Sequence, residues 1–111
     1  MPANTPKMLA HGQFAAAAAV IYPSPALTTT IIKEINLCNL GAAVNVVTLR
    51  IVDGGGTGVA SDNLTDAGMS LAVGETVIRT GSLILEAGDT LVGFATNATQ
   101  VNYHVSGIQV T

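Results

Sequence analysis

Two acidic residues stand in matched surroundings and could together hold a metal ion. Glu75 lies in the phrase LAVGETV (71–77), and Asp89 lies in the phrase LEAGDTL (85–91), fourteen residues further along. Carboxylate oxygens are the ligands of hard cations, but such a site needs several more oxygen ligands at defined spacings. Each phrase supplies a single acid, so the spacing does not favour a metal site.

The glycines give the repeat a simpler explanation. Gly74 and Gly88 are each the third residue of a four-residue turn. A type II turn requires a positive φ at that place, which glycine adopts without steric cost. The acid and threonine that follow restart an extended chain. We therefore predict one turn made twice, at corners where the chain passes between the two sheets of a sandwich, with Glu75 and Asp89 only following the turns.

The other reactive residue types form no recognisable constellation. His11 and His104 lie far apart, and neither has an acid beside it. Cys38 is the sole cysteine, so an internal disulfide and a cysteine-based zinc site are excluded, and in an apolar strand it acts as a small hydrophobe. DGGGTG (53–58) lacks the Lys-Ser/Thr ending of a phosphate-binding loop. The spacing of Asp53, Asp62 and Asp66 matches no compact calcium-binding loop. We expect no enzyme, no metal and no cofactor.

Short strands account for most of the chain. In residues 28–39 apolar and polar side chains alternate, and the predicted apolar face carries Ile31, Ile35 and Leu37. Lys33 is the odd member of that face. Residues 44–52 alternate in the same way. Because only Leu40–Ala43 separates them, we expect the two strands to form an antiparallel hairpin.

Three further segments complete the pattern. In 101–110 the apolar phase flips at Gly107, which predicts a β-bulge in the last strand. The five alanines of 15–19 lead into β-branched residues and favour a strand over a helix. Residues 53–68 and the first thirteen residues read as irregular and as natural places for contacts with neighbours.

The composition points to association with other proteins. Apolar residues make up 49% of the 111 residues and charged residues only 10%, against about 25% in ordinary soluble domains. No stretch of about 18 apolar residues could span a membrane. Four scattered bases and a net charge of −3 cannot neutralise a phosphate track, so nucleic-acid binding is disfavoured. The first fourteen residues carry no secretory signal, so we expect synthesis in a cytoplasm.

Three segments carry a resemblance to a known group of proteins: IKEINLCN within 31–39, GDTL (88–91), and the closing strand VNYHVSGIQV (101–110). Together with the flanking residues, most of the chain after about residue 14 resembles small β-sandwich structural proteins of tailed-bacteriophage virions. The resemblance implies a non-enzymatic module present in many copies, often as symmetric trimers. Such modules occur as capsid decoration (cement) proteins, as head fibres, and in tails or baseplates.

We therefore predict an all-β chain: an antiparallel β-sandwich of jelly-roll type (14–111) preceded by an extended N-terminal arm (1–13). The expected role is a decoration protein, made in the host cytoplasm, that bridges major capsid protein subunits or another virion protein. A tail, neck or baseplate part, or a receptor- or glycan-binding module, stays open as an alternative. The candidate contact residues lie in the arm and in the long loop: Pro2, Pro6, Lys7, Met8, Leu9, Asp53, Gly55, Asn63 and Asp66.

Overall fold

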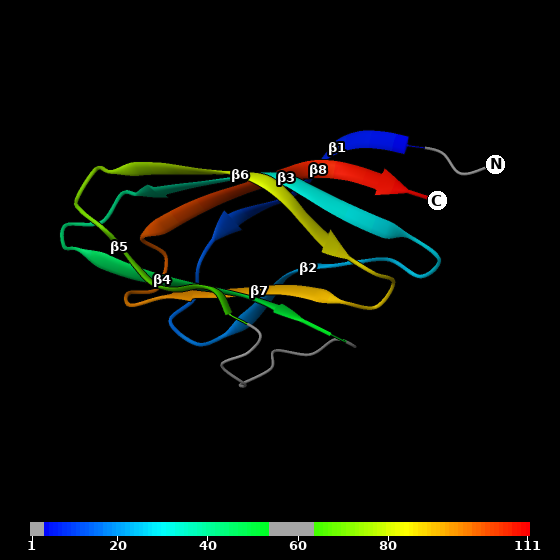
Figure 1. Cartoon of the computed structure of the whole chain (residues 1–111). Helices are drawn as coiled ribbons and strands as arrows, with labels where there is room; N and C mark the ends of the chain where they lie inside the picture. Colours follow the sequence, from blue (N-terminus) through cyan, green and yellow to red (C-terminus); the bar gives the residue numbers. More distant parts are fainter. Residues whose placement is uncertain (1–3, 54–63) are drawn as a thin grey trace.

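Eight strands form two four-stranded antiparallel sheets that pack face to face (Figure 1). The computed structural model describes residues 4–53 and 64–111. The first sheet has the order β1-β8-β3-β6, and the second has the order β2-β7-β4-β5. The strands are β1 (Asn4–Gln13), β2 (Ala19–Pro23), β3 (Thr29–Asn39), β4 (Asn45–Val52), β5 (Leu64–Leu71), β6 (Thr76–Leu85), β7 (Thr90–Ala95) and β8 (Val101–Val110). The predicted all-β jelly roll is confirmed.

The chain changes sheet at every connection except the one from β4 to β5. The expected hairpin of β3 and β4 is therefore wrong, because these strands belong to different sheets. Each buries one apolar face, and Leu37 of β3 and Leu49 of β4 meet in the core between the sheets. Two alternating strands joined by a short segment fit a hairpin and a crossing equally well, and the local pattern does not distinguish them.

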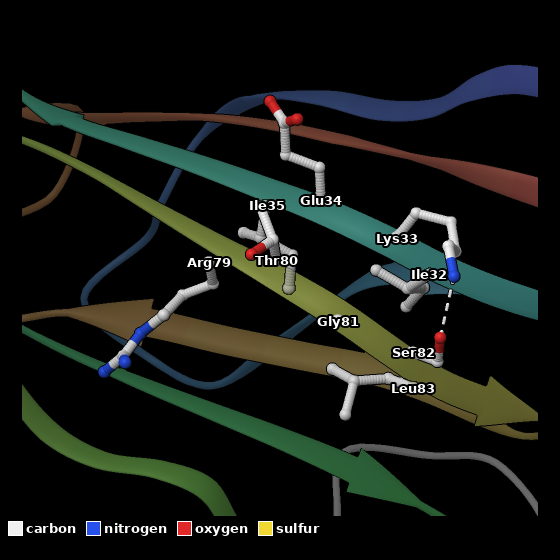
Figure 2. Close-up of a pocket in the computed structure, with 9 residues that line it drawn as sticks. All are labelled: Ile32, Lys33, Glu34, Ile35, Arg79, Thr80, Gly81, Ser82 and Leu83. Atoms are coloured by element: carbon white, nitrogen blue, oxygen red, sulfur yellow. Dashed lines mark hydrogen bonds between the residues drawn. The ribbon is translucent and has the colours of Figure 1, made fainter.

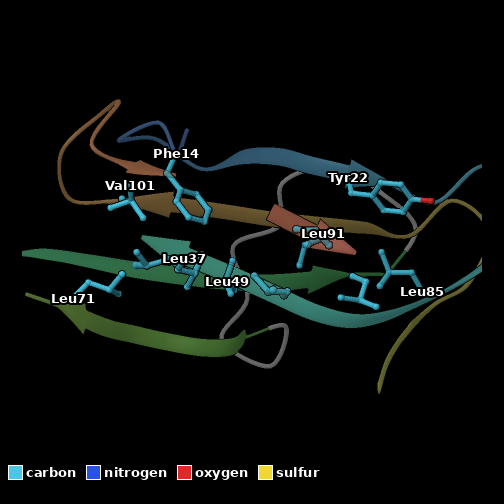
Figure 3. Close-up of a cluster of buried hydrophobic side chains, with 13 residues drawn as sticks. Phe14, Tyr22, Leu37, Leu49, Leu71, Leu85, Leu91 and Val101 are labelled. Atoms are coloured by element: carbon cyan, nitrogen blue, oxygen red, sulfur yellow. The ribbon is translucent and has the colours of Figure 1, made fainter. Parts of the chain in front are cut away.

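The core lies between the sheets and draws aliphatic side chains from both (Figure 3). Burying each such side chain contributes about 1.5–3 kcal/mol. Phe14, in the connection from β1 to β2, is only 2% exposed and anchors that connection. The alanine run was predicted as a strand, but β2 begins only at Ala19, and residues 15–18 belong to the connection. The buried cluster comprises Phe14, Tyr22, Ile32, Ile35, Leu37, Val47, Leu49, Leu71, Leu85, Leu91, Ala95, Val101 and Val105.

Residues 4–13, which the sequence led us to expect as irregular, form the edge strand β1. This strand pairs antiparallel with β8, so the two ends of the described chain lie side by side (Figure 1). Leu9 and Ala10 are partly buried and pack against the core, whereas Asn4–Met8 are exposed. The separate contribution of residues 1–13 to folding stays a prediction.

The apolar phase change at Gly107 involves no inserted residue in β8, which keeps its alternation: Val105 and Gly107 face inward, and Ile108 faces outward. The inserted residues lie in the neighbouring strands. Leu9 is extra in β1, between the pairs made by Ser106 and Val105, and Lys33 is extra in β3, between the pairs made by Gly107 and Ser106. Gly107 is buried, and a Cβ there would collide with the carbonyl oxygen of Ile31. Glycine is therefore required at this position because the β3 backbone approaches closely, and not because a turn or a bulge is made there.

The extra residue in β3 also changes which side chains reach the core. With Lys33 inserted, Ile32 and Ile35 both point inward, at 2% and 3% exposure. Ile31 was predicted to share the face of Ile35, but it lies on the opposite, outer face of the sheet. Successive side chains of a strand alternate between faces, so one inserted residue reverses the assignment on one side of it.

The two repeated phrases are corners between the sheets, as predicted. The first joins β5 to β6 and the second joins β6 to β7. Gly74 and Gly88 have φ values of 77° and 88°, the geometry of the third residue of a type II turn. The Glu75 N–H donates to the Ala72 carbonyl (3.0 Å), and the Asp89 N–H donates to the Glu86 carbonyl (3.0 Å).

The acids take part in these turns, which the sequence interpretation missed. Glu75 Oε1 accepts the Ala72 N–H (2.8 Å), and Asp89 Oδ2 accepts the Glu86 N–H (3.0 Å). The first and fourth residues of each turn therefore exchange two hydrogen bonds, one through the backbone and one through the carboxylate. An acid recurs after the glycine because its oxygen satisfies a backbone donor that no strand pairs.

Replacing either turn glycine with valine should destabilise the fold. Gly74→Val or Gly88→Val forces a β-branched residue to a positive φ, so the free energy of unfolding should fall by about 1–3 kcal/mol. Urea denaturation followed by circular dichroism measures this. Asparagine tolerates the same conformation, so Gly74→Asn and Gly88→Asn are the matched controls and should cost less; equal losses would contradict the conformational explanation.

The same measurement separates the hydrogen bond of Glu75 from its charge. Glu75→Gln keeps an acceptor oxygen and should change the free energy of unfolding by less than about 0.5 kcal/mol. Glu75→Ala leaves the Ala72 N–H without its acceptor and should cost about 1 kcal/mol. If Glu75→Gln were as damaging as Glu75→Ala, the charge itself would be required and a cation site at this corner would return to consideration.

Candidate protein-interaction surfaces

The predicted contact residues fall in two different sheets. Pro6, Lys7 and Met8 are exposed on the edge strand β1, with Met8 at 53% exposure. Leu9 is partly buried against the core. Asp53 is exposed at the end of β4. Asp66 belongs to β5, in register with Leu49, while Pro2, Gly55 and Asn63 lie outside the described residues.

The strand register brings together two histidines that the sequence keeps apart. His11 of β1 pairs with His104 of β8, and the two rings stack with centroids 5.8 Å apart and planes at 26°. Both are exposed on the outer face of the first sheet, on which Cys38 is partly buried. Within residues 4–53 and 64–111, no group of three or more His, Cys, Asp or Glu side chains is arranged to hold a metal ion.

Tyr103, the neighbour of His104 in β8, packs against the core. The ring of Tyr103 tilts against Phe14, with centroids 4.8 Å apart, on the core side of β8. Burial raises the pKa of its phenol above the ordinary value. The group therefore stays protonated at neutral pH and presents no reactive oxygen to the surface.

A shallow pocket of about 210 Å³ lies between β3 and β6 (Figure 2). It marks the level at which Lys33 is inserted in β3 and Gly81 and Ser82 are inserted in β6. Lys33 Nζ donates to Ser82 Oγ (2.8 Å), and Arg79 points away toward the second sheet, where it meets Met69 Sδ (3.4 Å). The side chains of Lys33 and Arg79 therefore make contacts within the sandwich.

One end of the sandwich is held by a buried asparagine network that the sequence analysis did not anticipate. Asn39 is fully buried, and its Nδ2 donates to the carbonyls of Ala43 (2.9 Å) and Leu71 (3.0 Å). Its backbone bonds the first corner, with the Gly74 N–H on its carbonyl (2.9 Å) and its own N–H on Glu75 O (3.0 Å). The side chain and the backbone of Asn39 together connect the end of β3 to the segment between β3 and β4 and to the corner between β5 and β6.

Asn45 extends the network to a third connection. Its Nδ2 donates to Asn39 Oδ1 (3.0 Å), and its Oδ1 accepts the Asn97 N–H (3.0 Å) from the segment between β7 and β8. The two asparagines are the first and last residues of the short segment NLGAAVN (39–45). This placement is the signal by which the sequence could have indicated the network. Paired buried amides at a crossing satisfy backbone groups that no strand pairs.

A second polar cluster holds the opposite end of the sandwich. Ser24 bonds the second corner as Asn39 bonds the first, since its N–H donates to Asp89 O (2.8 Å) and its carbonyl accepts the Gly88 N–H (3.1 Å). Its hydroxyl bonds Thr30 Oγ1 (3.0 Å), which in turn bonds the Tyr22 hydroxyl (3.0 Å). Each copy of the repeated phrase therefore docks on the end of a strand in the same manner.

Removing the Asn39 side chain should test whether this network stabilises the fold. Asn39→Ala removes a donor from the Leu71 carbonyl and the acceptor of both the Gly41 N–H and Asn45 Nδ2, so the free energy of unfolding should fall by about 3 kcal/mol. Asn36, in the same strand, donates its side-chain N–H to Glu34 Oε1 (2.8 Å). Asn36→Ala should therefore cost less than about 1 kcal/mol. Similar losses for both variants in urea denaturation would contradict the network's role.

Within the described part of the chain, the structure contains no helix that could cross a membrane.

Solved structures share this fold at low sequence identity, and no family model or curated protein sequence matches the chain. A chain of infectious bursal disease virus, Gx strain, superposes with a TM-score of 0.56 and 12% identity over 99% of this chain; the match spans 32% of the viral chain. A chain of the Bacillus endospore appendages, described as disulfide-linked pili, superposes with a TM-score of 0.53 and 21% identity. That match covers 100% of this chain and 87% of the appendage chain.

A pentameric capsid protein from metagenomic phage sequences is also similar, with 20% identity over 93% of this chain. Its TM-score of 0.30 is too low to carry an argument. The viral and appendage structures show that this chain has a fold found both in a virus particle and in a bacterial surface filament. At identities of 12% and 21%, they show the fold alone.

Proposed function

We propose that this chain is a non-enzymatic structural protein of a tailed-phage virion, a decoration protein that binds the outer capsid surface and bridges neighbouring subunits. The observation that carries the proposal is the complete jelly roll, which over 99% of its length resembles part of a virus particle's chain. The resemblance of residues 31–39, 88–91 and 101–110 to phage virion proteins gives the more specific role.

The surface chemistry supports a role in binding other proteins. Within the described residues, no group of three or more His, Cys, Asp or Glu side chains is arranged to hold a metal ion. Several large apolar side chains are exposed instead, among them Leu27 at 92%, Leu40 at 62% and Ile84 at 59%. With 10% charged residues, this surface fits one that is largely covered in an assembly. Many modest contacts repeated by symmetry would then resist separation of capsid subunits.

The appendage similarity favours one second candidate, a subunit of a filament. Its chain matches this one along 87% of its own length, so the two are comparable in size as well as in fold. Within a phage, a filamentous role corresponds to a tail, neck or fibre component. A decoration protein and a fibre subunit both act through protein–protein contacts, but they differ in copy number and position.

Copy number in purified particles distinguishes these roles. A decoration protein should co-purify with virions in amounts comparable to the major capsid protein, and antibody labelling should cover the head. Band intensities of density-gradient-purified particles measure the ratio. A few copies confined to the tail would favour the fibre or baseplate role. Absence from particles, together with filaments assembled from the purified protein alone, would contradict the virion proposal.

Deletion of residues 1–13 tests the proposed contact role of the N-terminal segment. The variant should stay folded with cooperative unfolding, because β1 is an edge strand and places only Leu9 and Ala10 against the core. Its binding to capsids, measured by co-sedimentation with particles stripped of the protein, should weaken. Loss of cooperative unfolding would show instead that β1 is required for the core.

A further inference from the structure

The outer face of the first sheet carries a continuous row of apolar side chains. Ile84 of β6 pairs with Ile31 of β3, Ile31 pairs with Ile108 of β8, and Ile108 pairs with Pro6 of β1. These four residues, the apolar row, cross all four strands of the sheet. Their inward neighbours Leu85, Thr30 and Ile32 are buried, so the row points away from the core.

Apolar residues also stand on both sides of this row. Met8, 53% exposed, lies two positions along β1 from Pro6, and Val110 lies two positions along β8 from Ile108. A contiguous apolar patch of this kind on a sheet surface is typical of an interaction site, whereas scattered apolar residues are not.

Beyond the row, the charged residues of β3 on this face are a neighbouring pair of opposite sign. The carboxylate of Glu34 accepts the Asn36 side-chain N–H (2.8 Å), and the exposed, inserted Lys33 donates from its Nζ to Ser82 Oγ (2.8 Å). Depletion of charge is what distinguishes the centre of an interface from ordinary surface. The outward positions are Asn4, Pro6, Met8, His11 and Gln13 of β1; Asn102, His104, Ser106, Ile108 and Val110 of β8; Thr29, Ile31, Glu34, Asn36 and Cys38 of β3; and Thr76, Ile78, Thr80 and Ile84 of β6.

The size and symmetry of the face fit a second copy of the same face. Four strands about 4.8 Å apart and about 36 Å long, from the 11 residues of β3, cover on the order of 700 Å². A stable interface needs about 800 Å² of accessible surface per partner, and projecting side chains bring the flat area up to this value. A two-fold axis parallel to the strands sets Ile31 over Ile108 and Pro6 over Ile84, so the row meets itself.

We propose that two copies of this chain associate through the outer face of the first sheet, with the apolar row as the apolar band of the contact near one end of the strands. The row itself contains no charged residue, so a partner that carries the same face sets apolar side chains opposite it. The contact is two-fold, so it yields dimers, or joins higher oligomers in pairs, and does not by itself produce the trimer that the family resemblance implies. It is independent of whether the protein sits on a capsid.

The chain offers a matched pair of residues to test this. Ile84 and Ile78 lie on the same strand and the same face, with 59% and 58% exposure. Ile84 belongs to the apolar row, whereas Ile78 stands in a polar row with Asn36, His104 and His11. A glutamate at either exposed position should leave folding intact, which circular dichroism and thermal unfolding verify.

Sedimentation velocity of the full chain over a concentration series gives the result. Wild-type protein should self-associate; Ile84→Glu should raise the dissociation constant roughly tenfold or more, because it places an unpaired charge among the apolar side chains of the contact. Ile78→Glu should raise it less than about threefold. A wild-type chain that stays monomeric at a concentration of about 10⁻⁴ M would overturn the proposal. Equal effects of the two variants would overturn it as well. So would an oligomer that Ile84→Glu leaves unchanged. Capsid co-sedimentation of the same variants is scored separately, so failure of self-association and failure of the decoration role are distinguishable.

Discussion

The sandwich depends on the satisfaction of backbone hydrogen bonds where the chain crosses from one sheet to the other. A strand within a sheet finds its partners along its length, but a crossing segment leaves the ladder and must find others. Buried Asn39 supplies them at one end, bonding β3 to the segments on either side of it. Ser24 supplies them at the other end through the second corner. The apolar core between the sheets is generic by comparison, since aliphatic residues of similar volume can replace one another there at modest cost.

This arrangement explains why a short chain uses the same phrase twice. Gly74 and Gly88 set the turn, and the acid after each closes it with a second hydrogen bond. Each corner then docks on the end of a strand, at Asn39 or at Ser24, by the same pair of backbone bonds. The repetition follows from two crossings in opposite directions, into β6 and out of it, and not from a duplicated ligand site.

Sequence patterns were sufficient for the fold class and for the corners, because period-two alternation and turn glycines are local signals. They were not sufficient for the pairing of strands. The short segment after Asn39 fits a hairpin and a crossing alike, and the choice depends on where β4 finds a partner, which is β7 and β5. The phase change near Gly107 was visible, but it is not a bulge in β8: Ile108 stands on the outer face of a regular strand, and the inserted residues are Leu9 and Lys33 of the adjacent strands, which only the register reveals. Candidate contact residues of β1 could be named from the sequence, and they stay a prediction, whereas the apolar row joins residues from four separate strands.

The single extra residue in β3 has an effect beyond local geometry. Counting back from Leu37 in strict twos would place Ile31 inside the sandwich; because the bulge at Lys33 takes up one residue, Ile31 lies outside, in register with Ile84 and Ile108. The bulge lets one strand present apolar side chains to both faces, with Ile32 and Ile35 toward the core and Ile31 outside. If the chain passed position 33 without a bulge, the residues on one side of it would exchange faces, and a strand of unchanged composition would lose either its core contacts or its apolar residue on the outer face.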